Sequence, residues 1–134
     1  MSCIFCKIIA GDIPAKTVYE DNEFKAILDT APASRGHVLI LPKEHADDLM
    51  ALSDDTLAKV LPLAKKIAAA TSSSLEPAGI KLVQNNGETA GQSVRHFHMH
   101  VIPCYDGHEV GNWQPTAPSD EELDAVRDAI AKAL

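Results

Sequence analysis

Three histidines alternate with apolar residues in the stretch SVRHFHMHVIP, residues 93–103, although the whole 134-residue chain holds only six histidines. Successive side chains of a β-strand point to opposite faces of a sheet, so this alternation predicts a strand whose two faces differ in chemistry. Phe97 and Met99 would then pack in the core. The imidazoles that would share the opposite face are those of His96, His98 and His100.

Other short segments are rich in β-branched or aromatic residues and are bounded by Gly, Pro, Asn or Asp, which is typical of strands. Residues 17–20 and 23–29 indicate a hairpin, because YEDNEF supplies a turn between them. The remaining candidates are residues 37–42 and 79–86. Together with the histidine segment, we expect about five strands.

A long helix is predicted over residues 52–74, where apolar residues recur at helical spacing. Ser53 can cap its N-terminus. Pro62 should bend this helix or delay its start, because proline has no N–H to donate to the Ala58 carbonyl.

A second helix is predicted over residues 118–134, with Ser119 and Glu122 as a capping box. Residues 105–119 indicate a loose connection before it. Strands, one long helix, more strands and a terminal helix favour an α+β fold with a largely antiparallel sheet. The length suits a single domain over residues 1–134.

Composition excludes several classes of function. No apolar run approaches the ~18 residues of a membrane-spanning helix. The net charge of -7, with twelve basic residues that form no run, argues against a surface that binds nucleic acid. The N-terminal residues lack a secretory signal pattern, and three cysteines suit a reducing compartment. We therefore expect a cytoplasmic protein that is not bound to a membrane.

The histidine pattern alone leaves three interpretations open: a solvated strand face, a zinc site, or a histidine nucleophile near neutral pH. The preceding loop, NNGETAGQS at residues 85–93, adds evidence. Gly87 and Gly91 allow close backbone approach, and Gln92 and Ser93 offer polar side chains. Such a loop is what an oxyanion or phosphate requires.

These residues form a signature. HFHMHVI fits His-φ-His-φ-His-φ-φ, where φ is apolar, and with GQSV before it the stretch strongly resembles the histidine triad (HIT) superfamily of nucleotide hydrolases and transferases. CIFCKIIAGDIPAKTVYED and ILDTAPASRGHVLILPKEH are similar to two further blocks of the family. The chain looks most like the branch of small histidine-triad nucleotide-binding proteins, which are homodimers acting on purine nucleoside phosphoramidates and related AMP- or GMP-type mononucleotides.

The resemblance implies roles for the histidines. His98 matches the nucleophile that attacks the α-phosphorus and forms a nucleotidyl-histidine, while the main-chain carbonyl of His96 holds its other nitrogen. His100 matches a phosphate contact. The catalytic assignments are therefore His96, His98 and His100. No catalytic metal is implied.

The resemblance also implies a nucleotide pocket. Asp29 would bind the ribose hydroxyls, although a turn residue is the alternative interpretation. His37 would lie near the phosphate oxygens, and Gln92 and Ser93 would donate to the phosphate and the leaving group. An apolar slot near Ile27 would favour purines by contact area. The residues assigned to nucleotide binding are Ile27, Asp29, His37, Asn85, Gly91, Gln92 and Ser93.

Cys3 and Cys6 form a Cys-x-x-Cys pair, which occurs in zinc sites and in redox motifs. A redox role would need a strand before the pair, and none is predicted there. The resemblance implies a structural zinc held by the pair with His45 and His96; the alternative is two reduced thiols. If zinc occupies His96, that residue is structural and does not donate a proton to the leaving group. Cys104 has no assigned role.

Four functions remain as hypotheses. The first is hydrolysis of nucleoside 5'-phosphoramidates or related adenylyl compounds, and the second is a dinucleoside polyphosphate hydrolase with the same nucleophile. The third is a nucleotide-binding or signalling module with little turnover. The fourth is a zinc protein whose histidines only chelate, against which the loop and Asp29 argue. His108 and Trp113 lie in the tail that least resembles the family.

Overall fold

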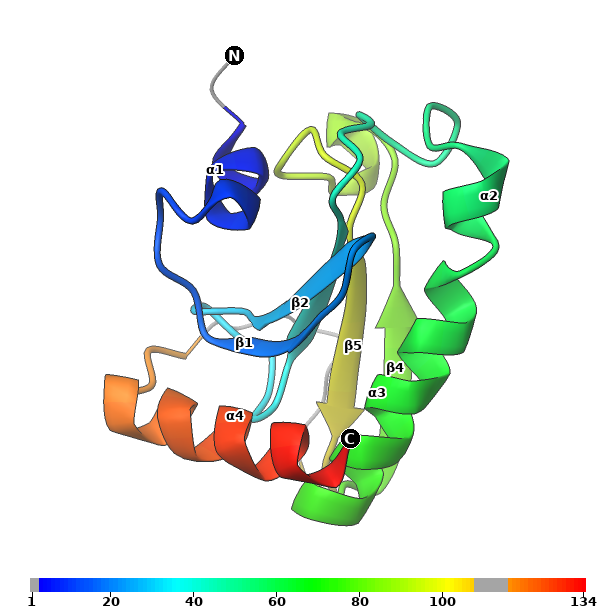
Figure 1. The fold of residues 1–134 in the computed structure, drawn as a ribbon. Coiled ribbons are helices and arrows are strands. Elements are labelled where there is room, and N and C mark those ends of the chain that lie inside the picture. The colour runs from blue at the N-terminus through cyan, green and yellow to red at the C-terminus, as the bar shows by residue number, and fades with distance from the viewer. Residues whose placement is uncertain (1–2, 108–115) are drawn as a thin grey trace.

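The computed structural model describes residues 3–107 and 116–134, and the expected α+β fold with an antiparallel sheet is confirmed (Figure 1). The five strands are β1 (Thr17–Glu20), β2 (Phe24–Leu28), β3 (Val38–Pro42), β4 (Gly79–Val83) and β5 (Met99–Cys104). They lie in the order β1-β2-β3-β5-β4, and each pair of neighbours is antiparallel. β5 therefore lies inside the sheet, between β3 and the edge strand β4.

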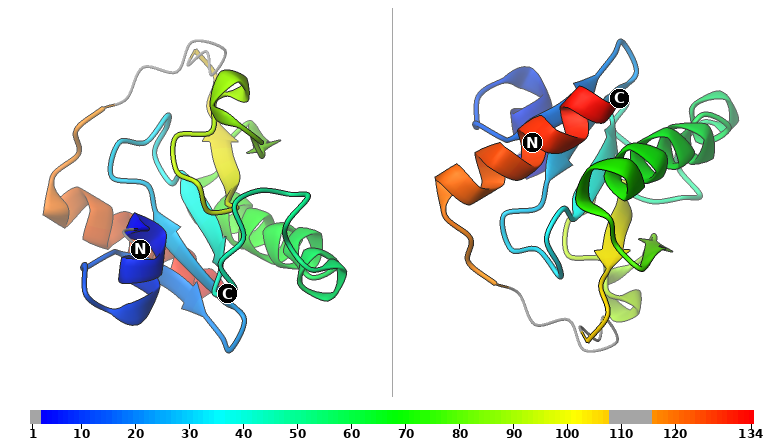
Figure 2. Two further views of the ribbon diagram at one scale, coloured as in Figure 1. Left: turned by 90° about the horizontal axis from the view of Figure 1, so that it is seen from above. Right: turned by 90° about the horizontal axis from the view of Figure 1, so that it is seen from below.

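Helices lie on both faces of the sheet (Figure 2). They are α1 (Ile4–Ala10), α2 (Asp54–Leu57), α3 (Val60–Leu75) and α4 (Asp120–Ala133), with a short 3-10 turn η1 (Glu88–Ala90). Among the described residues, no helix combines the length and apolar character needed to cross a membrane.

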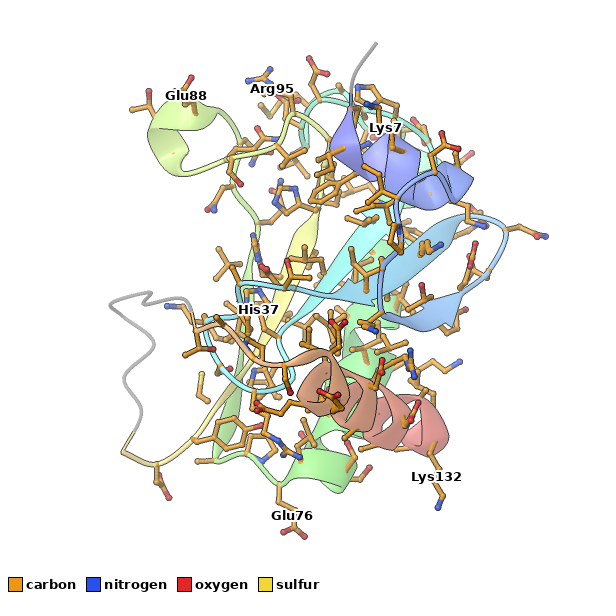
Figure 3. The ribbon with its side chains drawn as sticks, turned by 90° about the vertical axis from the view of Figure 1, so that its left-hand side faces the viewer. Lys7, His37, Glu76, Glu88, Arg95 and Lys132 are labelled. Carbon is orange, nitrogen blue, oxygen red and sulfur yellow. The ribbon has the colours of Figure 1, made fainter. Side chains whose placement is uncertain are left out.

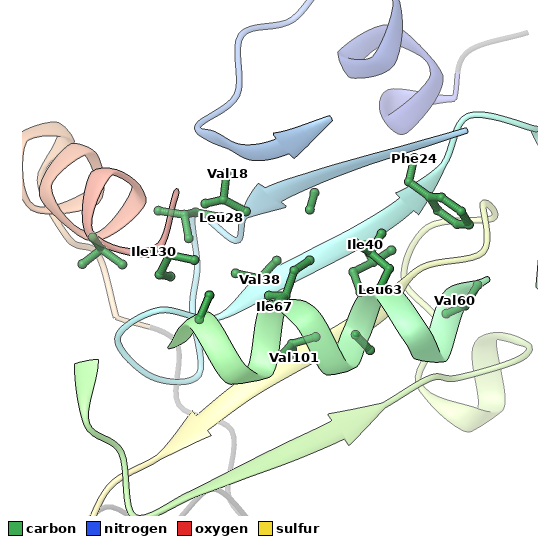
Figure 4. Close-up of a cluster of buried hydrophobic side chains, with 14 of the residues drawn as sticks. Val18, Phe24, Leu28, Val38, Ile40, Val60, Leu63, Ile67, Val101 and Ile130 are labelled. Carbon is green, nitrogen blue, oxygen red and sulfur yellow. The ribbon is translucent and has the colours of Figure 1, made fainter. Parts of the chain in front are cut away.

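The two faces of the sheet bury two separate cores. On one face, α3 packs against alternate residues of the strands (Figure 4), and α4 contributes Ile130. Val38 and Ile40 of β3 point to this face and are fully buried, whereas the intervening Leu39 joins a smaller core with Phe5 of α1 on the other face. Strand alternation thus divides β3 between the two cores.

The predicted long helix is interrupted, as Pro62 required. α2 ends at Leu57, and α3 begins at Val60, which places Pro62 in the first turn of α3. A first-turn N–H has no partner within a helix, so proline is tolerated there. The Ser53 side chain caps α2 by accepting the Thr56 N–H.

The C-terminal helix is confirmed, and the Ser119 hydroxyl accepts the Glu122 N–H at 3.2 Å. The helix lies beside α3 on the same face of the sheet. Most of the predicted connection over residues 105–119, with His108 and Trp113, falls outside the described residues.

α1 was not predicted from the sequence. Cys3 caps it by accepting the Cys6 N–H at 3.4 Å, an uncommon residue for this position, and Gly11 ends it with φ of 88°. Seven residues are too few for helical periodicity to be read with assurance.

The start of the histidine strand was predicted wrongly. β5 begins at Met99, so His96 and His98 precede it. The ladder with β3 ends at the pair of Ile40 and Met99. Beyond it, the His96 ring donates to the Pro42 carbonyl at 2.8 Å, and the Phe97 N–H donates to the Ala46 carbonyl at 2.8 Å.

Candidate functional site

The candidate site lies on the face of the sheet that carries α1. A cavity of about 490 Å³ opens there between α1, the end of β2 and the histidine segment. Figure 3 places Lys7 of α1 and Arg95 at the same end of the molecule, with His37 nearer the middle. The residues predicted from the sequence that line the cavity are Ile27, Asp29, Ser93, His98 and His100.

The His98 ring is held in one protonation form by its own backbone. Its Nδ1 lies 2.8 Å from the His96 carbonyl oxygen, and a carbonyl can only accept, so the proton of the neutral ring resides on Nδ1. Nε2 then carries a lone pair. Burial lowers the pKa of His98. The hydrogen bond to the His96 carbonyl and the charge of Asp29 raise it, but by less than burial lowers it. His98 is thus a neutral imidazole with a basic nitrogen, as a nucleophile requires.

A second chain of hydrogen bonds fixes His100. The Ala33 N–H donates to His37 Nδ1 at 3.0 Å, so the neutral His37 ring carries its proton on Nε2. That Nε2–H donates to His100 Nδ1 at 2.9 Å, which leaves the His100 proton on Nε2. His100 is therefore prepared as a hydrogen-bond donor, and its ring lies 5.0 Å from that of His98.

Burial keeps this pair of imidazoles uncharged. It lowers the pKa of His37 to about 4 against the opposing charge of Asp29, and the pKa of His100 to about 3, where His98 and His37 add to the effect. His37 is 1% exposed and cannot reach bulk water. The site accordingly offers neutral donors to an anion rather than imidazolium charges.

Asp29 lies at the edge of the cavity. Its Oδ1 accepts the Ala31 N–H at 2.9 Å, which fits the turn interpretation, and its Oδ2 lies 3.8 Å from His37 Nε2. Because His37 is neutral, this second contact is not an ion pair. A carboxylate that lines a cavity and keeps acceptor capacity also suits hydroxyl recognition.

The loop before the histidines is arranged differently from the expectation. Gln92 is 3% exposed; its Oε1 accepts the Gly87 N–H at 2.7 Å, and its Nε2 donates to the carbonyls of Asp47 and Val94. These main-chain bonds occupy its amide, so Gln92 closes the loop instead of lining the cavity. The Asn85 amide packs against Gly91, whose φ of 100° favours glycine.

A third group of side chains meets beside the cavity. Of the described residues, those that could hold a metal ion here are Cys3, Cys6, His45 and His96. His96 Nε2–H donates to the Pro42 carbonyl at 2.8 Å, and His45 Nε2–H to Asp47 at 3.3 Å. Each ring therefore turns an unprotonated Nδ1 toward the sulfurs, with its other nitrogen fixed as metal-ligating histidines require.

The spacing of these atoms fits a tetrahedral metal site. The two Nδ1 atoms are 3.1 Å apart, yet neither carries a hydrogen to share. Three of the four sulfur-to-nitrogen distances are 3.2 Å for Cys6 to His45, 3.4 Å for Cys3 to His96 and 3.6 Å for Cys6 to His96. Zinc bonds of usual length at tetrahedral angles would give about 3.6 Å between sulfur and nitrogen and about 3.3 Å between nitrogens. Burial, and then the Cys3 thiol, raise the pKa of Cys6, so metal binding there releases a proton.

Asp29, His37 and His100 also come close enough to hold a metal ion. Here, however, the two rings share a hydrogen bond with a defined donor and acceptor, which accounts for their closeness. In the Cys-His cluster, the thiols can donate to the two unprotonated Nδ1 atoms, but no hydrogen accounts for the 3.1 Å approach of those two Nδ1 atoms to each other. The four residues of that cluster therefore make the stronger metal site.

The apolar wall of the cavity comes largely from residues that sequence reasoning missed. Phe5 and Ile8 of α1 lie opposite Ile27 of β2 and Leu39 of β3, and all four are buried. The Phe5 ring meets that of His98 edge-on at 5.0 Å between centroids. Phe5 and Ile8 are three positions apart, and Gly11 follows them. This spacing and the glycine are a faint helical signal that was available in the sequence.

The structure therefore sorts the predicted site residues into groups. Ile27, Asp29, Ser93, His98 and His100 surround one cavity. His37 lies behind His100. His96 lies in the metal cluster and reaches His98 through its carbonyl. The residues that shape the preceding loop are Asn85, Gly91 and Gln92.

The chain is similar to the members of one known protein family. A family model described as the HIT domain matches residues 10–107. The adenosine 5'-monophosphoramidase hnt1 of Schizosaccharomyces pombe is 43% identical over 136 residues, covering 100% of this chain and 99% of that protein.

Two crystal structures are also similar to this chain. A Hit-like protein from Bartonella henselae, described as involved in cell-cycle regulation, has a TM-score of 0.91 at 33% identity, covering 99% of this chain and 97% of that one. A Zn-bound histidine triad family protein from Mycobacterium smegmatis has a TM-score of 0.86 at 38% identity, covering 98% and 95%.

Proposed function

The chain belongs to the HIT family, and on that premise we propose that it is a nucleotide hydrolase that cleaves purine nucleoside 5'-phosphoramidates or related adenylyl compounds at the α-phosphate. The observation that carries the proposal is the His98 ring, whose Nδ1 proton is held by the His96 carbonyl and whose Nε2 is unprotonated beside a cavity. The name of the S. pombe relative, a phosphoramidase, supports the substrate class.

The proposed reaction has two displacements at phosphorus. His98 Nε2 attacks the α-phosphorus, the bond to the leaving amine breaks, and the amine takes up a proton as it departs. Water then attacks the same phosphorus, the Nε2–P bond breaks, and the mononucleotide is released. The His98 Nδ1–H bond to the His96 carbonyl stabilises the positive charge that the ring acquires in the intermediate.

The neighbouring residues supply binding and orientation. His100 donates from Nε2 to a phosphate oxygen, and Ser93 offers its hydroxyl on the leaving-group side of the same cavity. Asp29 accepts hydrogen bonds from the ribose. The wall of Ile27, Leu39, Phe5 and Ile8 takes the purine ring by apolar contact.

We further propose that the Cys-His cluster holds zinc, in keeping with its two thiols and two imidazoles and with the Zn-bound relative from M. smegmatis. Zinc there is structural, and His96 then takes no part in proton transfer to the leaving group. A homodimer and a cytoplasmic location complete the proposal.

The test is kcat/KM for adenosine 5'-phosphoramidate and for diadenosine tetraphosphate, with the wild type and with His98→Ala. We expect the phosphoramidate to be preferred and His98→Ala to lose about 10³-fold or more in kcat/KM. Preference for the tetraphosphate would support a dinucleoside polyphosphate hydrolase. Binding of AMP without turnover of either compound would support a sensor.

His98→Gly provides a sharper version of the same test. Imidazole added to this variant can enter the space left by the ring and attack phosphorus in its place. Partial recovery of turnover, with no effect of imidazole on the wild type, is expected for a nucleophile. A purely structural His98 would show no recovery.

A further inference from the structure

We propose that the metal ion of the Cys3, Cys6, His45 and His96 cluster positions the nucleotide site, so that metal and nucleotide bind with linked affinities. The inference rests on the proposed function, because it assumes that the cavity beside His98 takes a nucleotide. It goes beyond a structural role for the metal. Two separate connections join the cluster to the cavity, one through α1 and one through residue 96.

The first connection is the helix α1. Its N-terminal end supplies two metal ligands, Cys3 at the cap and Cys6 in the first turn. The same helix supplies Phe5 and Ile8 to the cavity wall. A helix of seven residues is not stable alone and depends on what holds it against the sheet.

The remaining attachments of α1 are modest. Phe5 and Ile8 belong to the smaller of the two cores, and Lys25 donates from Nζ to the Ile8 carbonyl at 3.3 Å. Ile4 is 47% exposed. A metal that joins Cys3 and Cys6 to two histidines from other parts of the chain therefore adds a strong constraint on the position of α1.

Phe5 links the position of α1 directly to the His98 ring. Its ring lies edge-on to both His98 and His96, with centroids 5.0 Å and 5.9 Å away. Phe5 is 7% exposed, so the ring has little room to move independently of the helix. Displacement of α1 would open the apolar wall and remove the ring against which His98 packs.

The second connection is residue 96 itself. Its side chain is a metal ligand, whereas its main-chain carbonyl accepts the Nδ1–H of His98 at 2.8 Å. A metal on His96 Nδ1, together with the bond from Nε2 to the Pro42 carbonyl, fixes this residue on two sides. The carbonyl that selects the His98 tautomer is then held in place as well.

Because both ligands favour the same arrangement of α1 and residue 96, each must increase the affinity of the other by the same factor. The first experiment uses the wild type alone. Zinc affinity is measured by competition with a chromophoric chelator, without AMP and with saturating AMP, and a blank without protein corrects for zinc bound by AMP. We expect zinc to bind about tenfold more tightly with AMP present.

The reciprocal measurement is AMP affinity by calorimetry, with zinc-loaded and zinc-free wild type, and the same factor is expected. Cys6→Ser removes one ligand and should weaken AMP binding about as much as zinc removal does. Cys104→Ser is the matched control, since this thiol lies at the end of β5 and not in the cluster. Phe5→Leu keeps all four ligands but should reduce the coupling factor.

The outcomes separate the two proposals. Equal zinc affinity with and without AMP, or no zinc binding at all, would overturn the linkage even if Cys6→Ser fails to fold. A wild type that binds zinc but no AMP would overturn the proposed function and the linkage together. A wild type that turns over the phosphoramidate equally well with and without zinc, at unchanged AMP affinity, would leave the function standing and remove only the linkage.

Discussion

At the level of single residues, main-chain groups decide which ring nitrogen of each site histidine carries the proton. The His96 carbonyl selects the tautomer of His98, and the Ala33 N–H selects that of His37 and, through it, that of His100. A main-chain group cannot change its protonation, so these assignments hold wherever the rings are neutral. Two predictions about pH follow from the burial of these rings.

The first prediction concerns the pH dependence of catalysis. Burial lowers the pKa of His98, so the nucleophile stays unprotonated below the ordinary histidine value of 6.5. We expect kcat/KM for the phosphoramidate to remain constant as the pH falls through 6.5 and to decline only at lower pH. A profile with its acid half-point at or above 6.5 would contradict a buried, neutral nucleophile.

The second prediction concerns stability. The pKa values of His37 and His100 in the folded protein, about 4 and about 3, lie below the value of an unfolded histidine. At a pH between the folded and the unfolded pKa, the unfolded chain therefore binds more protons than the folded protein does. The free energy of unfolding should therefore fall as the pH drops from 6.5 to 5, by about 1.6 kcal/mol for each histidine. Urea unfolding with chelator present, which removes the metal contribution, measures this loss.

The control for this prediction is His37→Gln, which removes one titrating group and its share of the loss, whereas His96 and His98, whose pKa values burial also lowers, keep theirs. The pH window ends at 5 because the carboxylates with lowered pKa values, such as Glu44 and Asp21, lose their contribution only at lower pH. A free energy of unfolding that stays constant between pH 6.5 and 5 would show that the rings are protonated in the folded protein.

At the level of elements, the sequence was informative where a segment carries its own signal. The hairpin of β1 and β2 follows from its turn, and the break between α2 and α3 follows from Pro62. α1 carries only the faint signal of Phe5 and Ile8 ahead of Gly11, because a seven-residue helix capped by a cysteine otherwise resembles a loop in sequence. Its position depends on partners distant in the chain, which local reasoning does not include.

Gly36 shows how tightly the elements meet behind the site. Its φ is 90°, and a Cβ built there would lie 2.5 Å from Leu75 Cδ1 of α3 and 3.3 Å from Pro103 Cγ of β5. Gly11 has nearly the same φ, 88°, but open space around it. A side chain would therefore meet the same backbone strain at both positions, but it would meet a packed core only at Gly36.

We expect Gly11→Ala to cost about 1 kcal/mol of stability from backbone strain alone. Gly36→Ala should cost about 1–2 kcal/mol more, because Leu75 must move within a packed core. Urea unfolding of the two variants gives the difference. Equal losses would mean that the core accommodates the added methyl group freely.

For the whole molecule, the histidine motif could be predicted from the sequence but its surroundings could not. His37 and His100 are 63 residues apart in sequence, and only the pairing of β3 with β5 brings them within hydrogen-bond distance. The side chain of Gln92 faces main-chain partners that no motif specifies. The resemblance to the family identifies the site residues, whereas their hydrogen-bond partners can be found only from the fold.

The proposed homodimer leads to a prediction at this scale. β4 is an edge strand, and its Leu82 is 43% exposed, so this edge is the surface we expect a second copy to cover. Sedimentation equilibrium should give twice the chain mass of 14.4 kDa for the wild type and a lower mass for Leu82→Glu.

Ala131→Glu, at an exposed position of α4, adds the same single negative charge and should leave the mass unchanged. A monomeric wild type would contradict the dimer itself. A Leu82→Glu variant that stays fully dimeric would place the interface on another surface.

The acceptor that orients His98 belongs to the main chain, and this has an evolutionary consequence. Every amino acid carries the same carbonyl, so a lineage can replace His96, abandon the metal and still inherit the tautomer of its nucleophile. Such a lineage must then acquire another way to hold the backbone of residue 96 in place and to hold α1 against the sheet. Loss of the metal ligands should therefore be accompanied by compensating changes in the packing around Phe5 rather than in the histidines that perform the chemistry.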